Sequence, residues 1–387
     1  MAQTPSSSAK GTAPKPNPAP RGARPSRASA PKARKDRRGA TSATPKAAPK
    51  PDRKPAKAAG RANQLGRSGT IALVGRPNVG KSTLFNAMVG ERLAITSHHP
   101  QTTRDRIAGI HTADRLQIVF QDTPGIHQPK TKLGRRMNDV ASGTAEDCDV
   151  VVFVVDVPID PAAEAQRTEA IRAKDKAVLA AVPKDKPVVL VINKIDRVKE
   201  KAKLLDVLTA YSELHDFAAV VPVSAKKRDG VERLRKVLGE LLPEGEPLYP
   251  EDDISDRPVR FFVAELVREQ VLMRTRQEVP HGVAVTVDAF EEPHGKASAK
   301  RSPITRITIS VHVAKDSHKG IIIGQGGKML AAIGTAARER AERLLGQRIH
   351  LDIRVKTTPD WFDNAARLVE LGYADEKVGS PSSLRTS

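Results

Sequence analysis

The chain has 387 residues, 39% of them hydrophobic, which suffices for two packed domains of ordinary size and a tail. Its 65 Lys and Arg outnumber 45 Asp and Glu, and the single cysteine, Cys148, excludes an internal disulfide and a multi-thiolate metal site. The apolar residues 150–155 that follow it favour a buried, inert thiol. No apolar run approaches the ~20 residues that a membrane-spanning helix needs.

The first 68 residues differ in composition from the rest of the chain. They hold 17 Lys and Arg against only Asp36 and Asp52, and 11 of the 29 prolines. Leu65 is their only large aliphatic residue after Met1, so they cannot bury enough apolar surface to offset the entropy of ordering. We expect a disordered basic tail that either contacts a polyanion such as nucleic acid or keeps the protein soluble. A transit peptide fits its Pro and Lys content poorly, and the tail lacks the apolar run of a secretory signal, so we expect a cytoplasmic protein.

A phosphate-binding loop is predicted where the folded part begins. Residues 70–74 form a short apolar run, the loop Gly-Arg-Pro-Asn-Val-Gly-Lys-Ser follows at 75–82, and residues 81–89 have helical spacing. This strand, loop and helix match the G-x-x-x-x-G-K-S/T pattern in the context that it requires. The glycines let backbone N–H groups and the helix N-terminus point at phosphates. We expect Lys81 to supply charge to the β and γ phosphates and the Ser82 hydroxyl to bind magnesium.

Two later segments are expected to sense the γ phosphate. Residues 122–125, Asp-Thr-Pro-Gly, follow a strand-like run. Asp122 is expected to hold magnesium through water and the Gly125 amide to contact the γ phosphate. A switch segment must also offer a hydroxyl to magnesium while the γ phosphate is present. Thr102 and Thr103 are the candidates, and we favour Thr103.

Ile126 stands where Ras-type proteins carry a glutamine that orients the attacking water. Isoleucine cannot do this, so hydrolysis must rely on backbone groups, magnesium, another loop or a second cation. We therefore expect a slow intrinsic rate. Asn78 in the phosphate loop is a candidate ligand for a monovalent cation such as K⁺ near the β and γ phosphates, and it equally fits a surface turn.

The base is predicted to be guanine. Asp196 ends the segment 193–196, Asn-Lys-Ile-Asp, and can accept from the two donors on guanine's Watson–Crick edge, where adenine presents an acceptor. Such a pair is worth about 1.5–3 kcal/mol, enough to discriminate by one to two decades. Asn193 and Lys194 are expected to brace the base and the phosphate loop. Residues 224–226, Ser-Ala-Lys, fit the loop that completes the pocket, and all these motifs follow strand-like runs, as ligand-binding residues of open parallel sheets do.

A second folded unit is predicted after a linker. Pro and Gly residues end the first unit, which we place at 69–245, and the linker then spans 246–257. Periodicity predicts a helix over 258–273, strands over 283–290 and 304–314, a helix over 327–345 and a strand over 349–355. The predicted order is α–β–β–α–α–β for a domain at 258–375, followed by a flexible C-terminus at 376–387.

A glycine loop in this unit is a candidate for RNA binding. Residues 321–328, Ile-Ile-Ile-Gly-Gln-Gly-Gly-Lys, carry a G-x-x-G loop that opens a helix. In KH modules this loop clamps the backbone of about four nucleotides, because glycines let phosphates approach main-chain N–H groups. Four letters alone favour a plain helix-start turn, whereas the surrounding α–β–β–α–α–β order favours the clamp. Aromatic residues are only 3% of the chain, too few for base-stacking platforms, so we expect Trp361 and Phe362 to be packing anchors.

The whole set of motifs resembles the Era family of bacterial ribosome-assembly GTPases. The resemblance runs from about residue 71 to 373 and rests on GRPNVGKST, QTTRDRIAGIHT, QDTPGIHQPK, NKID, VPVSAK, PEDDISDRPVRFFVAELVRE and IIIGQGGKMLAAIG. It implies an α/β fold, a three-layer P-loop GTPase domain with a mainly parallel sheet, followed by an α+β type II KH domain. The apolar residue at 126 agrees with the family pattern. The basic tail departs from it, and we interpret the tail as an extra contact with ribosomal RNA.

The resemblance also implies a function. The protein is then expected to hydrolyse GTP, to bind small-subunit ribosomal RNA near its 3′ end under the control of GTP state, and to assist 30S ribosomal subunit assembly and maturation. Peripheral contact with the inner face of the cell membrane is a family property, and we expect a monomer. A membrane-associated regulatory GTPase whose C-terminal domain binds a protein is the alternative, and RNA binding that weakens steeply with salt favours the first. An RNA-modifying partner GTPase needs a reactive C-terminal cysteine, which Cys148 does not provide.

The candidate site residues follow from the motifs and the resemblance. Catalytic roles are expected for Lys81, Thr103 and Gly125, and magnesium ligation for Ser82, Thr103 and Asp122. The expected nucleotide contacts are Gly75, Arg76, Pro77, Asn78, Val79, Gly80, Lys81, Ser82, Thr83, Asp122, Thr123, Pro124, Gly125, Ile126, Asn193, Lys194, Ile195, Asp196, Ser224, Ala225 and Lys226. The expected RNA contacts are Lys315, Lys319, Gly324, Gln325, Gly326, Gly327 and Lys328.

Overall fold

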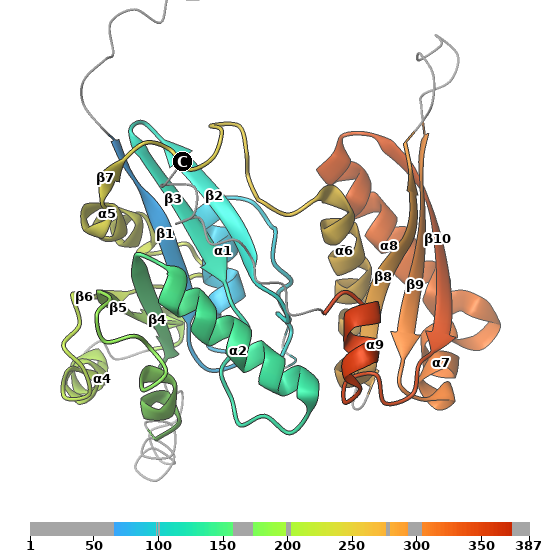
Figure 1. Cartoon of the computed structure of the whole chain (residues 1–387), viewed down its shortest axis with the longest axis horizontal. Coiled ribbons are helices and arrows are strands. Elements are labelled where there is room, and N and C mark those ends of the chain that lie inside the picture. Colours follow the sequence, from blue (N-terminus) through green and yellow to red (C-terminus); the bar gives the residue numbers. More distant parts are fainter. Residues whose placement is uncertain are drawn as a thin grey trace, which may run out of the picture. The chain divides into compact units, whose positions relative to one another are not determined.

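A computed structural model describes residues 66–97, 99, 101–157, 173–198, 203–275, 279–292 and 304–373. The expectations for residues 1–65 and for the C-terminus at 376–387 lie outside these ranges. The described residues form an α/β domain and a smaller α+β domain, in the order that the sequence predicts (Figure 1). Among their helices, none combines the length and the apolar character needed to cross a membrane.

A seven-stranded sheet is the centre of the first domain. Its strands are β1 (Gly66–Val74), β2 (Ile107–Ala113), β3 (Leu116–Asp122), β4 (Val150–Asp156), β5 (Val188–Asn193), β6 (Ala219–Pro222) and β7 (Glu244–Gly245). The order is β2-β3-β1-β4-β5-β6, with β7 paired to β1. The pairs β2/β3 and β1/β7 are antiparallel and the others are parallel. The ends of β1, β3, β5 and β6 therefore meet at one edge of the sheet.

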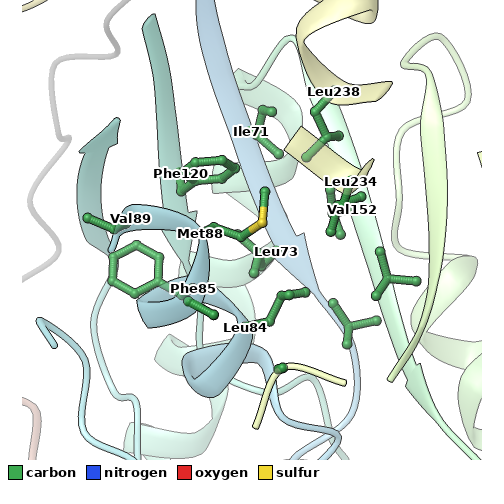
Figure 2. Close-up of a cluster of buried hydrophobic side chains, with 14 of the residues drawn as sticks. Ile71, Leu73, Leu84, Phe85, Met88, Val89, Phe120, Val152, Leu234 and Leu238 are labelled. Atoms are coloured by element: carbon green, nitrogen blue, oxygen red, sulfur yellow. The ribbon is translucent and has the colours of Figure 1, made fainter. Parts of the chain in front are cut away.

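Helices cover both faces of this sheet. They are α1 (Lys81–Val89), α2 (Lys132–Asp147), α4 (Lys203–Ser212), α5 (Val231–Leu241), the 3-10 helix η1 (Ile195–Arg197) and a helix over 173–179. Ile71 and Leu73 of β1 point to one face and pack with α1 and α5, as Figure 2 shows. Ala72 and Val74 point to the other face, where the core includes residues of α2 and α4. The predicted three-layer α/β architecture is confirmed.

Cys148 lies between α2 and β4 and is fully buried. Burial raises the pKa of its thiol to about 12. The thiolate that reacts with oxidants and metals is therefore scarce at neutral pH, which agrees with the expected inert thiol.

β1 begins four residues before the predicted run, inside the segment expected to be tail. Residues 66–68 are Gly-Arg-Ser, which carry no apolar alternation, so the sequence gives no strand signal there. The guanidinium of Arg67 holds this extension by donating to the carbonyls of Glu240 and Leu242 at 2.7 and 2.8 Å. The strand is thus extended by contacts with residues more than 170 positions away, which a local pattern cannot report.

The predicted linker at 246–257 lies along the edge of the sheet. The amide oxygen of Gln117 in β3 accepts from the backbone N–H of Tyr249 at 2.9 Å. Further along, the N–H of Ile110 in β2 donates to the carbonyl of Ile254 at 3.0 Å. The second bond satisfies a backbone group of the edge strand β2, and both bonds make the connection an ordered part of the first domain.

The second domain packs helices against a three-stranded sheet. Its elements are α6 (Val259–Arg274), η2 (Val279–Gly282), β8 (Val283–Glu291), β9 (Ile304–Val313), α7 (Asp316–Ile323), η3 (Gln325–Gly327), α8 (Lys328–Leu345), β10 (Arg348–Thr357) and α9 (Ala365–Glu370). The sheet order is β10-β9-β8, with β9 antiparallel to β8 and parallel to β10. This is the predicted α–β–β–α–α–β order with α9 added.

The core of the second domain explains its helix spacing. Val263, Val267 and Val271 recur every four residues on α6 and are completely buried in it. On α8, Ala337 and Ala341 are buried in the same core, where small side chains let the helix approach α6 and the sheet. Trp361 is fully buried and donates its ring N–H to the carbonyl of Gly282 at 3.1 Å, so it is a packing anchor as predicted.

Candidate functional site

The phosphate loop at 75–82 is braced by a second motif. Gly80 has a φ of +101°, and a Cβ at this position would lie 2.4 Å from Nδ2 of Asn193. Only glycine fits this close approach in a left-handed conformation. Nδ2 of Asn193 donates to the carbonyl of Val79 at 3.0 Å. The amide that ends β5 thus holds the loop that follows β1, which is the bracing role that the sequence predicts for Asn193.

Lys81 begins α1 and lies within the loop. Its side chain is buried, and Nζ donates to the carbonyls of Gly75 and Arg76, both at 3.0 Å. Burial lowers the pKa of the ammonium to about 8, although the nearby Asp122 carboxylate opposes that shift. The first turn of α1 carries no acidic residue and no side-chain cap. Its backbone N–H groups and its dipole therefore favour an anion at this end.

Three oxygen-bearing side chains from three segments meet beside Lys81. The hydroxyls of Ser82 and Thr103 lie 2.9 Å apart, and Thr103 donates to Oδ2 of Asp122 at 3.0 Å. Asp122 is completely buried, and its Oδ1 has no hydrogen-bond partner in the described parts of the chain. Burial raises the pKa of this carboxyl to about 6, against the lowering effect of Lys81. A buried carboxylate with an unsatisfied oxygen beside two hydroxyls fits a hard divalent cation such as Mg²⁺.

The structure distinguishes the two candidate threonines. Thr102 donates its hydroxyl to the carbonyl of His99 at 2.7 Å and lies 2.7 Å from the hydroxyl of Ser97. Its side chain is therefore used within its own loop, whereas Thr103 contacts Ser82 and Asp122. The preference for Thr103 over Thr102 agrees with this geometry.

The segment after Asp122 returns to the phosphate loop. The N–H of Ile126 donates to the carbonyl of Gly75 at 3.3 Å, and the Ile126 side chain packs against the core. A nearby polar pair was missed by sequence reasoning. The ring of His127 contacts the carbonyl of Gly125 at 2.9 Å through Nδ1 and the side-chain amide of Gln101 at 2.7 Å through Nε2. Gln101 and His127 each stand next to a residue of a predicted motif, and this proximity in the sequence was the signal that could have identified them.

The predicted guanine pocket assembles at the end of β5 and β6. The Ser224 hydroxyl donates to Oδ1 of Asp196 at 2.6 Å, which lowers the pKa of this partly exposed carboxyl. Oδ1 of Asn193 accepts from the N–H of Ala225 at 3.1 Å and thereby ties the two motifs together. Lys226 is exposed on the same turn. An ionised carboxylate that faces solvent from a fixed position is suited to accept from two donors of one base.

Two of the residues expected to contact the nucleotide use their side chains for other contacts. The guanidinium of Arg76 forms ion pairs with Asp175 and Asp156, at 2.5 and 3.1 Å. The Val79 side chain is buried in the core of the domain. Only the backbone groups of Arg76 and Val79 remain as candidates for phosphate contact, because their side chains are used for packing and ion pairing.

The predicted G-x-x-G loop joins α7 to α8 and lies beside a groove. Gly326 has a φ of +58°, and a Cβ built there would meet nothing within 4 Å among the described atoms. The adjoining groove has a volume of about 480 Å³. Its apolar floor and polar edge include Leu330, Leu351, Ile353, Thr335, Arg338 and His350. Apolar side chains beside an open glycine loop and basic side chains suit a single nucleic-acid strand.

Sequence reasoning missed Arg338 and His350, which line this groove. Arg338 is eleven residues after Gly327, about three helical turns, and so lies on the same face of α8. Helical spacing from the loop was therefore a usable signal. The predicted Lys319 is on α7, the helix before the loop, and Lys315 is the N-cap of that helix; neither lines the groove.

The loop that carries Thr103 also contacts the second domain, within one compact unit that contains all described residues. The buried guanidinium of Arg104 donates to the carbonyl of Val283 and lies over the ring of Trp361, 5.4 Å from its centroid. From the other side, Arg268 of α6 donates to the carbonyl of Thr102 at 2.6 Å. Both neighbours of Thr103 in the chain are thus bonded to elements of the second domain.

Comparisons with known families agree with this division. Residues 70–194 match a family described as 50S ribosome-binding GTPase, and residues 278–362 match the KH domain family. The chain is 45% identical over 307 residues to the GTPase Era of Geobacter sp. (strain M21), a match that covers 79% of this chain and 98% of the relative. It is 42% identical over 312 residues to the GTPase Era of Ruminiclostridium cellulolyticum, covering 80% and 99%.

Solved structures are also similar over both domains. Era in complex with MgGDPNP and nucleotides 1506–1542 of 16S ribosomal RNA superimposes with a TM-score of 0.72 at 37% identity, covering 80% of this chain and 99% of that one. A single-residue variant of Aquifex aeolicus Era bound to GDP·AlF4⁻ gives a TM-score of 0.70 at 37% identity with the same coverage. The similarity therefore extends across both domains and the connection between them.

Proposed function

Because the chain belongs to the Era family of GTPases, we propose that it couples its hydrolysis of GTP to binding of small-subunit ribosomal RNA near the 3′ end, during assembly and maturation of the 30S subunit. The observation that carries the RNA part is the open G-x-x-G loop beside a groove with an apolar floor and a basic edge. A relative that is 37% identical has been solved with nucleotides 1506–1542 of 16S ribosomal RNA, which supports the choice of RNA.

In this proposal the first domain holds GTP at the sheet edge. Backbone N–H groups of residues 75–82 surround the phosphates and Lys81 neutralises charge on the β and γ groups. Asp196 accepts from the guanine edge, supported by the Ser224 hydroxyl at 2.6 Å. Asn193 keeps the two ends of the site at a fixed separation, because it bonds both the phosphate loop and Ala225.

Magnesium is the proposed cofactor. Ser82, Thr103 and Asp122 would hold it, as the residues whose oxygens converge beside Lys81. When bound, the ion neutralises charge that develops on the phosphates and orients them. Thr103 contributes a hydroxyl only when its loop is closed over the site, so its position senses the γ phosphate.

The attacking water must be oriented without a side chain at position 126. Ile126 packs against the core. The groups that remain to orient this water are the Gly125 backbone, Thr103 and a monovalent cation. Because no side chain at position 126 orients the water, we expect slow intrinsic hydrolysis. For the cation, Asn78 offers an exposed side chain on a left-handed backbone, with its carbonyl held by Lys194 at 2.6 Å. Turnover that is faster in KCl than in NaCl supports a K⁺ site, and equal turnover in the two salts removes it.

GTP state is proposed to reach the RNA site through the Thr103 loop. The carbonyl of Thr102 is held by Arg268 of α6, and the side chain of Arg104 is held by Val283 and Trp361. A shift of Thr103 on hydrolysis therefore has to break or rearrange contacts with the second domain. By linkage, RNA then changes GTP affinity by the same factor as GTP changes RNA affinity.

Gly326→Asp tests the RNA function in the full chain. A carboxylate on the open side of the loop repels phosphate, and a side chain at the left-handed φ of position 326 strains the backbone. RNA binding is therefore expected to be lost. The probe is an RNA with the sequence of nucleotides 1506–1542 of 16S ribosomal RNA, titrated with GTP and with GDP by fluorescence anisotropy. Unchanged GTP affinity is the control for folding, and unchanged RNA affinity contradicts the proposal.

The wild-type chain tests the membrane-associated alternative. Flotation of the protein with vesicles of anionic phospholipid measures peripheral membrane contact, which the family resemblance implies. Vesicle binding that is strong in a protein with no affinity for the RNA favours the alternative. The match of residues 278–362 to the KH domain family favours RNA as the ligand of the second domain.

A further inference from the structure

A chain of ion pairs runs beside the phosphate loop. Arg76 donates from Nε to Oδ1 of Asp175 at 2.5 Å and from Nη2 to Oδ1 of Asp156 at 3.1 Å. The hydroxyl of Tyr211 in α4 donates to Oδ2 of Asp175 at 2.6 Å. At the other end, Oδ2 of Asp156 accepts from Nζ of Lys194 at 2.9 Å. Five side chains from five separate segments of the first domain thus form one continuous polar network.

This network is buried at one end. The side chain of Asp175 is 0% exposed and that of Arg76 is 16% exposed, whereas that of Asp156 is 27% exposed. Tyr211 lies in the hydrophobic core, and burial together with Asp175 raises the pKa of its phenol, so it remains a protonated donor. Desolvation makes such a pair a poor source of stability, since well-packed apolar residues often serve as well or better. Stability alone therefore does not explain why this position carries a buried ion pair.

The network holds the phosphate loop at two points. The carbonyl of Arg76, whose side chain is bound by Asp175, accepts from Nζ of Lys81 at 3.0 Å. Two residues further along, the carbonyl of Asn78 accepts from Nζ of Lys194 at 2.6 Å. Asp156 joins the two points because it accepts from both Arg76 and Lys194. The first half of the loop is therefore held through Asp175 and Asp156, two carboxylates that lie outside the expected nucleotide contacts.

We propose that Asp175 is a positioning residue for nucleotide binding, which acts through Arg76 to hold residues 76–78 in the shape that receives the phosphates. The carboxylate of Asp175 is bonded to Arg76 and Tyr211, and Asp175 is not among the expected nucleotide contacts. A loop that is already ordered loses less conformational entropy when the ligand binds, so the effect is on affinity. The inference rests on the proposed assignment of residues 75–82 as the phosphate-binding loop.

Asp175→Asn in the full chain tests the role, because it keeps the shape of the side chain and removes the charge. GDP and GTP affinity are expected to fall by roughly tenfold each, the size of one lost charge-assisted hydrogen bond. KM for GTP rises by a similar factor while kcat stays within about twofold, because ground-state and transition-state binding are affected alike. The preference for GDP over IDP, which differ only in the base, stays at the wild-type value.

The matched control is Asp114→Asn, a change of the same chemistry at an exposed turn between β2 and β3. It is expected to keep wild-type affinity. A purely structural role for Asp175 predicts a different result, namely a lower unfolding temperature with unchanged nucleotide affinity well below that temperature. That result, or a loss of the preference for GDP over IDP, overturns the inference.

A double-variant cycle tests whether Asp175 acts through Arg76. Loss of one partner leaves a buried charge unpaired, which is strongly destabilising, so the double variant Arg76→Gln/Asp175→Asn also protects against a folding failure. Adding Asp175→Asn to Arg76→Gln is expected to change GDP affinity less than about twofold, and additive losses overturn the pathway. Tyr211→Phe, which removes only one hydroxyl, is expected to give a smaller loss in the same direction.

The outcomes for the two proposals are separable. Absence of GDP binding by the wild-type chain removes the phosphate-loop assignment and this inference with it. Normal binding by the wild-type chain together with wild-type affinity in Asp175→Asn overturns the positioning role alone. Both proposals are supported if Asp175→Asn weakens GDP binding in the wild-type background and has no further effect in the Arg76→Gln background.

Discussion

The phosphate loop and the G-x-x-G loop each open a helix, and they differ in how much of their surroundings is filled. The phosphate loop is enclosed: Lys81 is buried beneath it, and a Cβ at Gly80 would collide with Asn193. The G-x-x-G loop is open, because a Cβ at Gly326 would meet nothing within 4 Å among the described atoms. Both loops present backbone N–H groups and a helix N-terminus, the same device for binding phosphate.

Under the proposed function, the difference follows from the size of the ligand. A nucleotide has a defined length, so a site that fixes both its phosphate end and its base end gains specificity from rigid contacts between the two, as Asn193 provides. A strand of RNA continues past the loop on both sides, so an enclosing wall would exclude it. The enclosed loop therefore needs supporting residues around it, whereas the open loop needs a neighbouring groove such as the one lined by Leu330 and Arg338.

The same small substitution in the two loops should have very different effects. In Gly80→Ala the new methyl group lies 2.4 Å from Nδ2 of Asn193 at a φ of +101°. Strain and the lost hydrogen bond to Val79 together cost about 3 kcal/mol, so GDP affinity is expected to fall by about a hundredfold or more. Titration calorimetry with GDP measures this. Gly80→Ala protein with wild-type GDP affinity would contradict the enclosed geometry.

Gly326→Ala is the matched change in the open loop. The methyl group enters open space, and only the left-handed backbone at a φ of +58° opposes it. That strain costs about 1–2 kcal/mol, so RNA affinity is expected to fall by about five- to thirtyfold, less than in Gly326→Asp. A loss of RNA binding as complete as that of Gly326→Asp would show that this side of the loop is filled when RNA is bound.

A substitution in the guanine pocket should affect nucleotide preference in the first domain without affecting RNA binding by the second. Asp196→Asn replaces an acceptor of two hydrogen bonds with a group that both donates and accepts, and the preference for GDP over XDP is expected to fall by about ten- to a hundredfold, with a shift toward xanthine. Competition between GDP and XDP measures it. The affinity for RNA is expected to be unchanged, and an unaltered nucleotide preference contradicts the guanine pocket.

The sequence predicts most of the enclosed site, because its parts are local. Each motif follows an apolar run, and the ends of parallel strands meet at one edge, so the convergence of Ser82, Asp122 and Asn193 follows from pattern and topology. The choice of Thr103 over Thr102 rested on expectation, and the contacts of the two hydroxyls agree with it. The fold of the second domain was predicted in the same way, from periodicity.

The supporting residues were not predictable, because they act across long sequence separations. Asp175 lies 99 positions from Arg76 and belongs to no motif, so nothing local marks it as a partner. Arg104 and Arg268 look like ordinary surface charges until the fold buries them. Residues 66–68 join β1 through contacts at the far end of the domain. In each case the information lies in a contact and not in a local pattern.

Arg338 offers the smallest expected effect and tests the groove beside the open loop. Its side chain is 40% exposed and pairs with Glu342 at 3.1 Å, so its charge at the groove remains accessible to solvent. Arg338→Gln is expected to weaken RNA binding by about fivefold at physiological salt, the effect of one phosphate contact, with GDP affinity unchanged. Fluorescence anisotropy with the same RNA over a series of salt concentrations measures it.

Salt dependence separates a phosphate contact from a general loss of positive charge. Loss of one phosphate contact reduces the slope of log affinity against log salt by about 0.7 for a single strand. Arg343→Gln is the matched control, since Arg343 is an exposed arginine on α8 that does not line the groove. It is expected to keep the wild-type slope, because distant charges are screened within about 8–10 Å. Equal slopes in the two variants would mean that RNA follows a different path from the G-x-x-G loop across this domain.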